Sequence, residues 1–117
     1  MDVREINGQL VMEYPADGPV LATVPDVIDL IGETFGNNAT VVVVPASRLA
    51  DDFFRLRTGF AGEVMQKFQN YRKRLIIVGD ISAHLAESKA LHDFVGETNR
   101  VGNHCFADGR EAMEAAV

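Results

Sequence analysis

The sequence has a single cysteine, no tryptophan and no long apolar run. Cys105 alone excludes an intramolecular disulfide and a zinc site built from cysteines. The longest β-rich apolar stretch, residues 40–44, is far shorter than the roughly 18–20 residues that a membrane span needs. The first residues show no basic segment followed by an apolar one, so no secretory signal is expected. Together these absences favour a cytoplasmic protein that does not enter a membrane.

The chain of 117 residues has room for one domain, which we expect to span residues 1–117. Its net charge of −6 opposes nucleic-acid binding by the surface as a whole. The charge is uneven, however: residues 48–74 hold seven basic and three acidic residues, and the remainder holds four basic and fourteen acidic ones. This cluster is either ordinary solvated charge or a surface that meets an anionic partner.

The first half of the chain carries clear signals for a hairpin and a helix. Asn7-Gly8 between residues 3–6 and 9–14 predicts two strands joined by a tight turn, because both turn positions need a positive φ. Thr23 predicts a helix N-cap, with Pro25 in the first turn. The apolar face that we expect on this helix consists of Val24, Val27, Ile28, Ile31 and Phe35.

The second half alternates strands with helices. Residues 40–44 and 75–78 read as strands buried on both faces, and residues 105–107 as a short last strand. A helix with Phe60, Ala61, Val64, Phe68 and Tyr71 on one face lies between the first two strands. A further helix has the inner face Leu91, Phe94, Val95 and Thr98, and Asp108 with Glu111 predicts a capping box for a final helix through Ala116.

This order predicts an α/β fold with a mixed β-sheet, an N-terminal hairpin and about four helices packed on the sheet. Strands that alternate with helices of roughly 10–15 residues imply parallel β-α-β crossovers, while the initial hairpin adds one antiparallel strand.

The residues from Thr40 to Asp80, TVVVVPASRLADDFFRLRTGFAGEVMQKFQNYRKRLIIVGD, resemble a known layout. A valine-rich strand, a loop, a small-residue helix start, an amphipathic helix and a strand that ends near glycine resemble STAS domains, the module of bacterial anti-sigma-factor antagonists and of sulfate-transporter cytoplasmic tails. The C-terminal ADGREAMEAAV is similar to the closing helix of that fold. The part from Asp51 to Asp80 more closely resembles the signature of a bacterial domain family of unknown function, number 4180. That resemblance extends over nearly the whole chain.

The resemblance to STAS antagonists draws attention to Thr58. In those proteins a serine directly before the glycine that opens the helix is phosphorylated, which breaks the partner complex, and Thr58 precedes Gly59 in the matching position. The aspartate and second serine of that pattern are replaced here by Leu56 and Arg57. Thr58 is therefore either a helix cap worth about 1 kcal/mol or a phosphorylation switch, and one role does not exclude the other.

Neighbouring residues supply the candidate binding site. Asp51 and Asp52 are either a cap for a short helical turn or a weak acid–base or metal signal, and Phe53 with Phe54 is expected to anchor this turn on the core. Gly59 and Gly62 imply close approach of another backbone, either the domain's own or a partner's, and internal packing is the favoured cause.

Arg55, Arg57 and Lys67 are either exposed cations or a cluster around a phosphate or carboxylate. Glu63 and Lys67 are expected to pair at i, i+4. His84, His92 and His104 lack ligand spacing, so no metal and no cofactor is expected.

Two functional hypotheses follow from the sequence. The first is a non-catalytic regulatory module that binds a protein partner through the surface of residues 51–70, gated at Thr58. The alternative is a sensor or small enzyme that binds a small anionic ligand, such as a phosphorylated metabolite, at the loop-to-helix junction of residues 51–63. The binding residues of this prediction are Asp51, Asp52, Arg55, Arg57, Gly59, Glu63 and Lys67.

Overall fold

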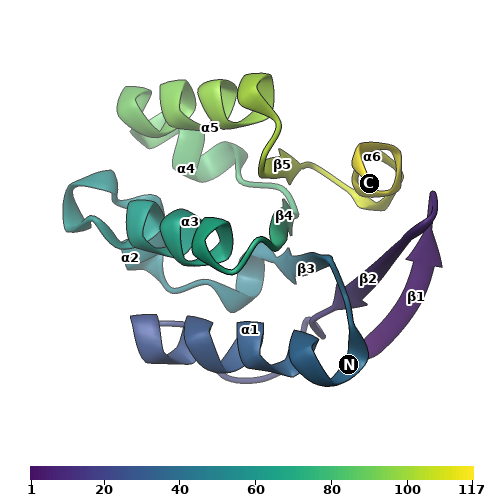
Figure 1. Cartoon of the computed structure of the whole chain (residues 1–117). Coiled ribbons are helices and arrows are strands. Elements are labelled where there is room, and N and C mark those ends of the chain that lie inside the picture. Colours follow the sequence, from purple (N-terminus) through teal and green to yellow (C-terminus); the bar gives the residue numbers. More distant parts are fainter.

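The computed structural model describes all 117 residues as five strands and six helices, with two short 3-10 turns in between (Figure 1). The strands are β1 Asp2–Ile6, β2 Gln9–Glu13, β3 Val41–Pro45, β4 Arg74–Val78 and β5 Cys105–Ala107. The helices are α1 Val24–Asn37, α2 Asp51–Phe54, α3 Phe60–Asn70, α4 Ser82–Glu87, α5 Lys89–Val101 and α6 Arg110–Ala116. None of these helices has the length and apolar character needed to cross a membrane.

The strands form one mixed sheet in the order β1-β2-β3-β4-β5. β1 runs antiparallel to β2, and the other neighbours are parallel. Asn7 and Gly8 form the turn with φ angles of 51° and 82°, which confirms the predicted hairpin. The α/β class and the mixed sheet are therefore confirmed. The expectation of about four helices is too low, because α2 and α4 are additional short helices.

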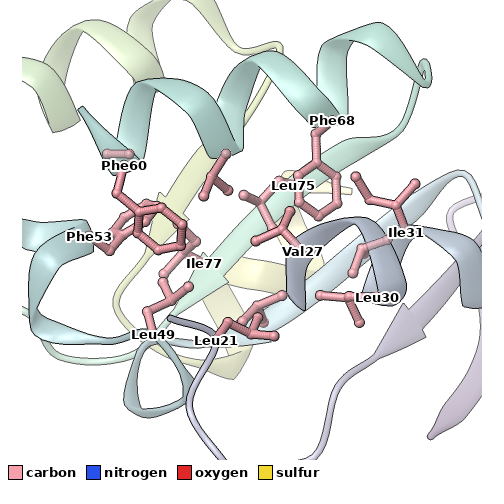
Figure 2. Packing of buried hydrophobic residues seen from close by; sticks show 14 of the residues in the cluster. Leu21, Val27, Leu30, Ile31, Leu49, Phe53, Phe60, Phe68, Leu75 and Ile77 are labelled. Carbon is pink, nitrogen blue, oxygen red and sulfur yellow. The ribbon is translucent and has the colours of Figure 1, made fainter. Parts of the chain in front are cut away.

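Alternate strand residues face two separate apolar clusters. On one face, residues such as Val42, Val44 and Leu75 join α1, α3 and α5 in a core of 19 buried residues (Figure 2). On the other face a smaller cluster of seven buried residues includes Met113 of α6. Because each crossover steps to the next strand in the same direction, the three long helices share one side and α6 lies on the other (Figure 1).

Helix α1 begins as predicted but presents a different face to the core. Thr23 and Asp26 form a capping box, and Asn38 ends the helix in the left-handed conformation. The buried face consists of Val27, Leu30, Ile31 and Thr34. The predicted face was wrong in part, because Phe35 is 60% exposed and packs edge-on against exposed Tyr71 at the surface, while Ile28 is also exposed.

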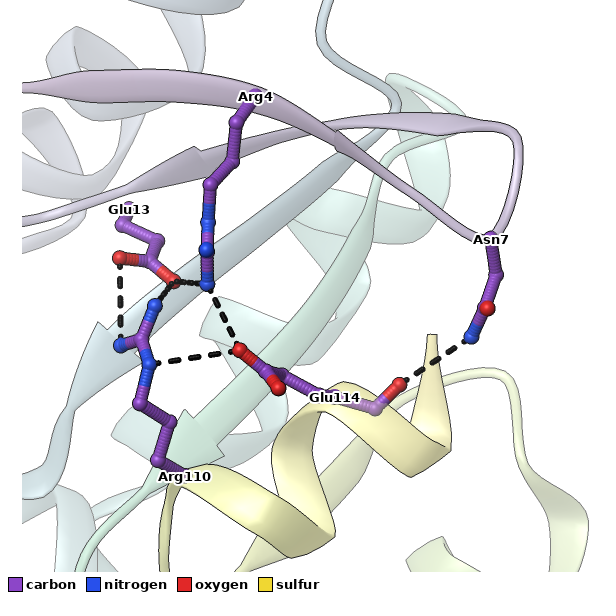
Figure 3. A network of polar contacts seen from close by, with 5 residues as sticks. All are labelled: Arg4, Asn7, Glu13, Arg110 and Glu114. Carbon is purple, nitrogen blue, oxygen red and sulfur yellow. Dashed lines mark hydrogen bonds and ion pairs between the residues drawn. The ribbon is translucent and has the colours of Figure 1, made fainter.

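The last helix, α6, starts without the predicted cap. Its N-cap is Gly109, with no side-chain hydrogen bond, so the capping box of Asp108 and Glu111 was wrong. Instead α6 is held by charges (Figure 3): Arg4 lies 3.0 Å from Glu114 and 3.1 Å from Glu13. Arg110 completes the network at 2.9 Å from Glu13. These ion pairs fasten the hairpin to the C-terminal helix.

Candidate functional site

The candidate site begins at the short helix α2. Its N-cap is Ala50, so the prediction that an aspartate caps this turn was wrong; Asp51 and Asp52 occupy the first turn instead, where the helix dipole favours negative charge. Phe53 and Phe54 are 0% and 5% exposed and pack edge to face, with ring centroids 5.2 Å apart. They anchor α2 on the core, as predicted, and so fix the loop that follows.

The turn between α2 and α3 is held by Thr58. The N-cap of α3 is Gly59, with φ 79°, so the prediction that Thr58 occupies the N-cap position was wrong. The exposed Thr58 hydroxyl nevertheless accepts a hydrogen bond from the Phe60 N–H at 3.2 Å. The same hydroxyl lies 2.7 Å from the Asp52 carbonyl oxygen and 2.9 Å from that of Arg55, and it can donate its single proton to either.

This turn places two arginines on the wall of a cleft. Asp51, Arg55 and Arg57 line one cavity of about 470 Å³. The opposite wall comes from α4 and the start of α5, with His84, Glu87, Ser88 and Ala90. The His84 ring stacks on Phe54 at 4.1 Å and 8°, which forms a flat side to the cleft. Three of the predicted residues therefore meet, together with a histidine that the sequence did not single out.

The charges in the cleft are incompletely paired. Arg55 lies 3.7 Å from Asp52, an exposed ion pair worth at most about 1 kcal/mol. Arg57 forms no ion pair or side-chain hydrogen bond, so its guanidinium retains all its donors for a ligand. An anionic group of a partner would find a fork-shaped donor there without first breaking a contact.

Not every predicted residue belongs to the cleft. The four predicted residues that do not line it are Asp52, Gly59, Glu63 and Lys67. Glu63 and Lys67 also form no ion pair, so that part of the prediction was wrong. The structure contains no group of three or more His, Cys, Asp or Glu side chains that could hold a metal ion.

The family model of a domain of unknown function, DUF4180, matches residues 6–117. The chain belongs to this family. The resemblance that the central motif indicated is thus confirmed at the level of the family. No curated protein and no solved structure matches the chain significantly. Since the family carries no assigned activity, the function of this DUF4180 domain has to be argued from its surface.

A groove between α3 and α5 lies beside the junction. Gly62, Met65 and Gln66 line one side of it, and Phe94 and Val101 line the other. A Cβ atom added to Gly62 would meet nothing within 4 Å. The favoured interpretation of the two glycines, internal close packing, was therefore wrong, since nothing within the domain approaches Gly62.

Arg48 belongs to the basic segment in sequence but not to its surface. The side chain is 4% exposed, and its guanidinium donates to the carbonyl oxygens of Pro15, Asp17 and Pro19 at 2.6 to 2.9 Å. It also stacks over the Tyr14 ring at 4.1 Å. The arginine binds the loop after β2 to the sheet. The sequence carries one signal for this role of Arg48: the loop of residues 14–19 is rich in proline and glycine, and its carbonyl oxygens need hydrogen-bond donors from elsewhere in the domain.

His104 and Cys105, where the last loop enters β5, are both buried. Cys105 belongs to the smaller apolar cluster, which confirms it as a buried core residue. The same burial raises the pKa of its thiol and so disfavours the thiolate. Burial, aided by the nearby positive charge of Arg74, lowers the pKa of His104. His104 Nδ1 accepts the Leu75 N–H at 3.0 Å, so the neutral ring continues the strand pairing.

Proposed function

We propose that this domain is a regulatory module of STAS-like organisation that binds a protein partner through the surface around the α2–α3 junction. The observation that carries the proposal is the convergence of Arg55 and Arg57 on one cleft beside the exposed hydroxyl of Thr58. The adjoining α3–α5 groove, with its open space at Gly62, enlarges the available surface. The partner supplies a carboxylate to the cleft and apolar side chains to the groove.

Thr58 gives this surface a means of control. In the unmodified protein the Thr58 hydroxyl donates its proton to the carbonyl oxygen of Asp52 or of Arg55. A phosphorylated Thr58 has no hydroxyl proton to donate, and its phosphate is largely doubly charged at neutral pH. The phosphate would therefore repel these two carbonyl oxygens. Phosphorylation would therefore break the turn that presents Arg55 and Arg57, and would itself compete with the partner's carboxylate for both guanidinium groups.

Capture of partners from a lysate of the native host tests this proposal. The full chain and the variants Arg55→Glu, Arg57→Glu and Lys67→Glu serve as baits. Lys67 is the matched control, since its charge lies on α3 but outside the cleft. A partner that is retained by the wild type and by Lys67→Glu, but lost with both arginine variants, supports the proposal. Equal capture by all four baits shows that the cleft is not the binding surface.

Regulation at Thr58 needs a separate measurement. Intact mass of the chain purified from its native host, before and after phosphatase treatment, reports whether a phosphate is present. Thr58→Val removes the acceptor while keeping the branched shape, so an unchanged mass difference in this variant would place any phosphate elsewhere.

The cleft also favours a second candidate function, the binding of a small anionic ligand. Its volume of about 470 Å³ is within the range of small-molecule sites, and the stacked His84 and Phe54 rings provide a flat wall beside the two arginines. Thermal-shift measurements with inorganic phosphate, nucleotides and sugar phosphates test it. A ligand at a hundredfold excess over its Kd stabilises by about 2.7 kcal/mol. No shift with any anion would exclude this function.

A further inference from the structure

The outer edge of β5 is a second candidate binding surface, separate from the cleft, where backbone hydrogen-bonding groups point away from the sheet. β5 is the last strand of the sheet and pairs only with β4 (Figure 1). In this parallel pair Cys105 and Ala107 direct their backbone groups toward β4, as the bond from the Gly79 N–H to the Ala107 carbonyl shows. Phe106 therefore directs its own N–H and C=O away from the sheet.

The side chain of Asn99 occupies both of these outward groups. Its Oδ1 accepts the Phe106 N–H at 2.7 Å, and its Nδ2 donates to the Phe106 carbonyl oxygen at 3.3 Å. A side-chain amide is chemically a peptide group, with one carbonyl acceptor and an N–H donor. Asn99 thus makes the two hydrogen bonds that one residue of an added antiparallel strand would make.

A hollow of about 670 Å³ runs along this edge on both faces of the strand. It has space for side chains of alternating direction, as an added strand requires. On the α5 side its walls are Leu85, Val95 and Phe106, and on the α6 side they are Cys105, Ala112 and Ala116.

Negative charge at one end of the hollow indicates which charge an occupant should carry. Asp80 and Asp108 follow the carboxyl ends of β4 and β5, and both line the hollow. Both are exposed, and neither forms an ion pair with a basic residue of this chain. A segment that lies along β5 would bring its flanking residue to these carboxylates, which favour a lysine or arginine there.

We propose that the edge of β5 binds an extended peptide segment of another protein, with small or apolar residues over the strand and a basic residue at Asp80 and Asp108. Asn99 leaves Phe106 when the peptide arrives. The exchange replaces one amide by another, so it loses no hydrogen bond at Phe106. Until then Asn99 keeps the edge from pairing unselectively.

Titration of the full chain with the peptide acetyl-Lys-Val-Thr-Val-Lys-amide tests the proposal. The readout is the amide signal of Phe106 and its hydrogen exchange, followed by ¹⁵N NMR in the wild type and in Asn99→Ala. We expect the peptide to shift and protect the Phe106 amide in both proteins. Asn99→Ala should bind it at least about threefold more tightly, because no side chain has to be displaced. A merely structural role of Asn99 would not produce this gain in affinity.

Two matched peptides make the test specific. The peptide with glutamates in place of both lysines should bind at least about threefold more weakly, because Asp80 and Asp108 repel it. The peptide N-methylated at its central residue should not protect Phe106. The proposal is overturned if neither the wild type nor folded Asn99→Ala shows a shift at millimolar peptide. It is equally overturned if Asn99→Ala alone dimerises and thereby protects Phe106, since the occupant would then be a second copy.

Discussion

The strongest single prediction concerns the buried guanidinium of Arg48. The change to test is Arg48→Met, which keeps most of the apolar stem and removes the charged group. In the wild type that group donates three hydrogen bonds to carbonyl oxygens of residues 15–19 and stacks on Tyr14. No carboxylate neutralises it, so the loop carbonyls and the Tyr14 ring compensate for the cost of burying the charge.

The magnitude follows from these contacts. A hydrogen bond from a charged donor contributes about 1.5–3 kcal/mol, and the cation–π contact about 1 kcal/mol. The freed carbonyls regain water once the loop opens, and the buried charge carries a desolvation cost, so the full sum is not realised. We expect Arg48→Met to lower the free energy of unfolding by about 3–4 kcal/mol. For a chain of this size that corresponds to a fall of about 12–16 °C in Tm.

Urea denaturation followed by circular dichroism measures this loss. Arg57→Met is the control, because Arg57 is exposed and has no partner; its effect should stay within about 0.5 kcal/mol. Arg48→Lys should fall between wild type and Arg48→Met, since lysine keeps the charge without the planar fork. If Arg48→Met loses less than 1 kcal/mol at an unchanged m value, the guanidinium does not hold the loop and the reasoning is refuted.

Four further predictions test individual contacts by urea denaturation. The pKa of His104 is lowered in the folded state, so the unfolded state binds more protons just below the ordinary pKa of 6.5. Stability should therefore fall as the pH drops below that value. His104→Asn keeps an acceptor for the Leu75 N–H and should lose this component of the pH dependence. Gly62→Ala should stabilise by about 0.5–1 kcal/mol, since the added Cβ meets nothing within 4 Å. A loss of stability would contradict the open space at this position. Gly59→Ala should destabilise by about 1 kcal/mol because φ is 79°; no loss would contradict the strain assigned to that position. Thr23→Ala should cost about 1 kcal/mol by removing the capping box of α1, and an unaltered midpoint would show that this cap is dispensable.

Local signals allowed most of the fold to be predicted. The Asn7-Gly8 turn, the Thr23 cap and the valine run need only neighbouring residues to be recognised, and each was confirmed. The face of α1 was harder, because hydrophobicity alone does not decide burial. Thr34 is fully buried since its hydroxyl donates to the Ile31 carbonyl at 2.6 Å, whereas the larger and more apolar Phe35 stays at the surface.

The candidate site depended on contacts that sequence does not reveal. The sequence placed Arg55 and Arg57 near a helix start, but the opposite wall of the cleft comes from α4, a six-residue helix that was not predicted. Only the tertiary structure brings His84 onto Phe54 and so closes the cleft. The Asn99 contact to Phe106 likewise joins a helix end to a strand through a side chain, which no periodicity indicates.

The basic residues of segment 48–74 therefore include two groups, those that donate hydrogen bonds within the domain and those that line the cleft. Arg48 and Lys73 use their charges internally, on loop carbonyls and on the Ala39 carbonyl, and Arg74 likewise donates to Ala116. These three side chains thus donate hydrogen bonds within the domain. What faces the cleft is the pair Arg55 and Arg57, of which only Arg57 is wholly unpaired. Recognition of an anionic group should thus depend on one or two arginines and not on the net charge of the segment, which is why reversal of a single charge at position 57 is the most informative change.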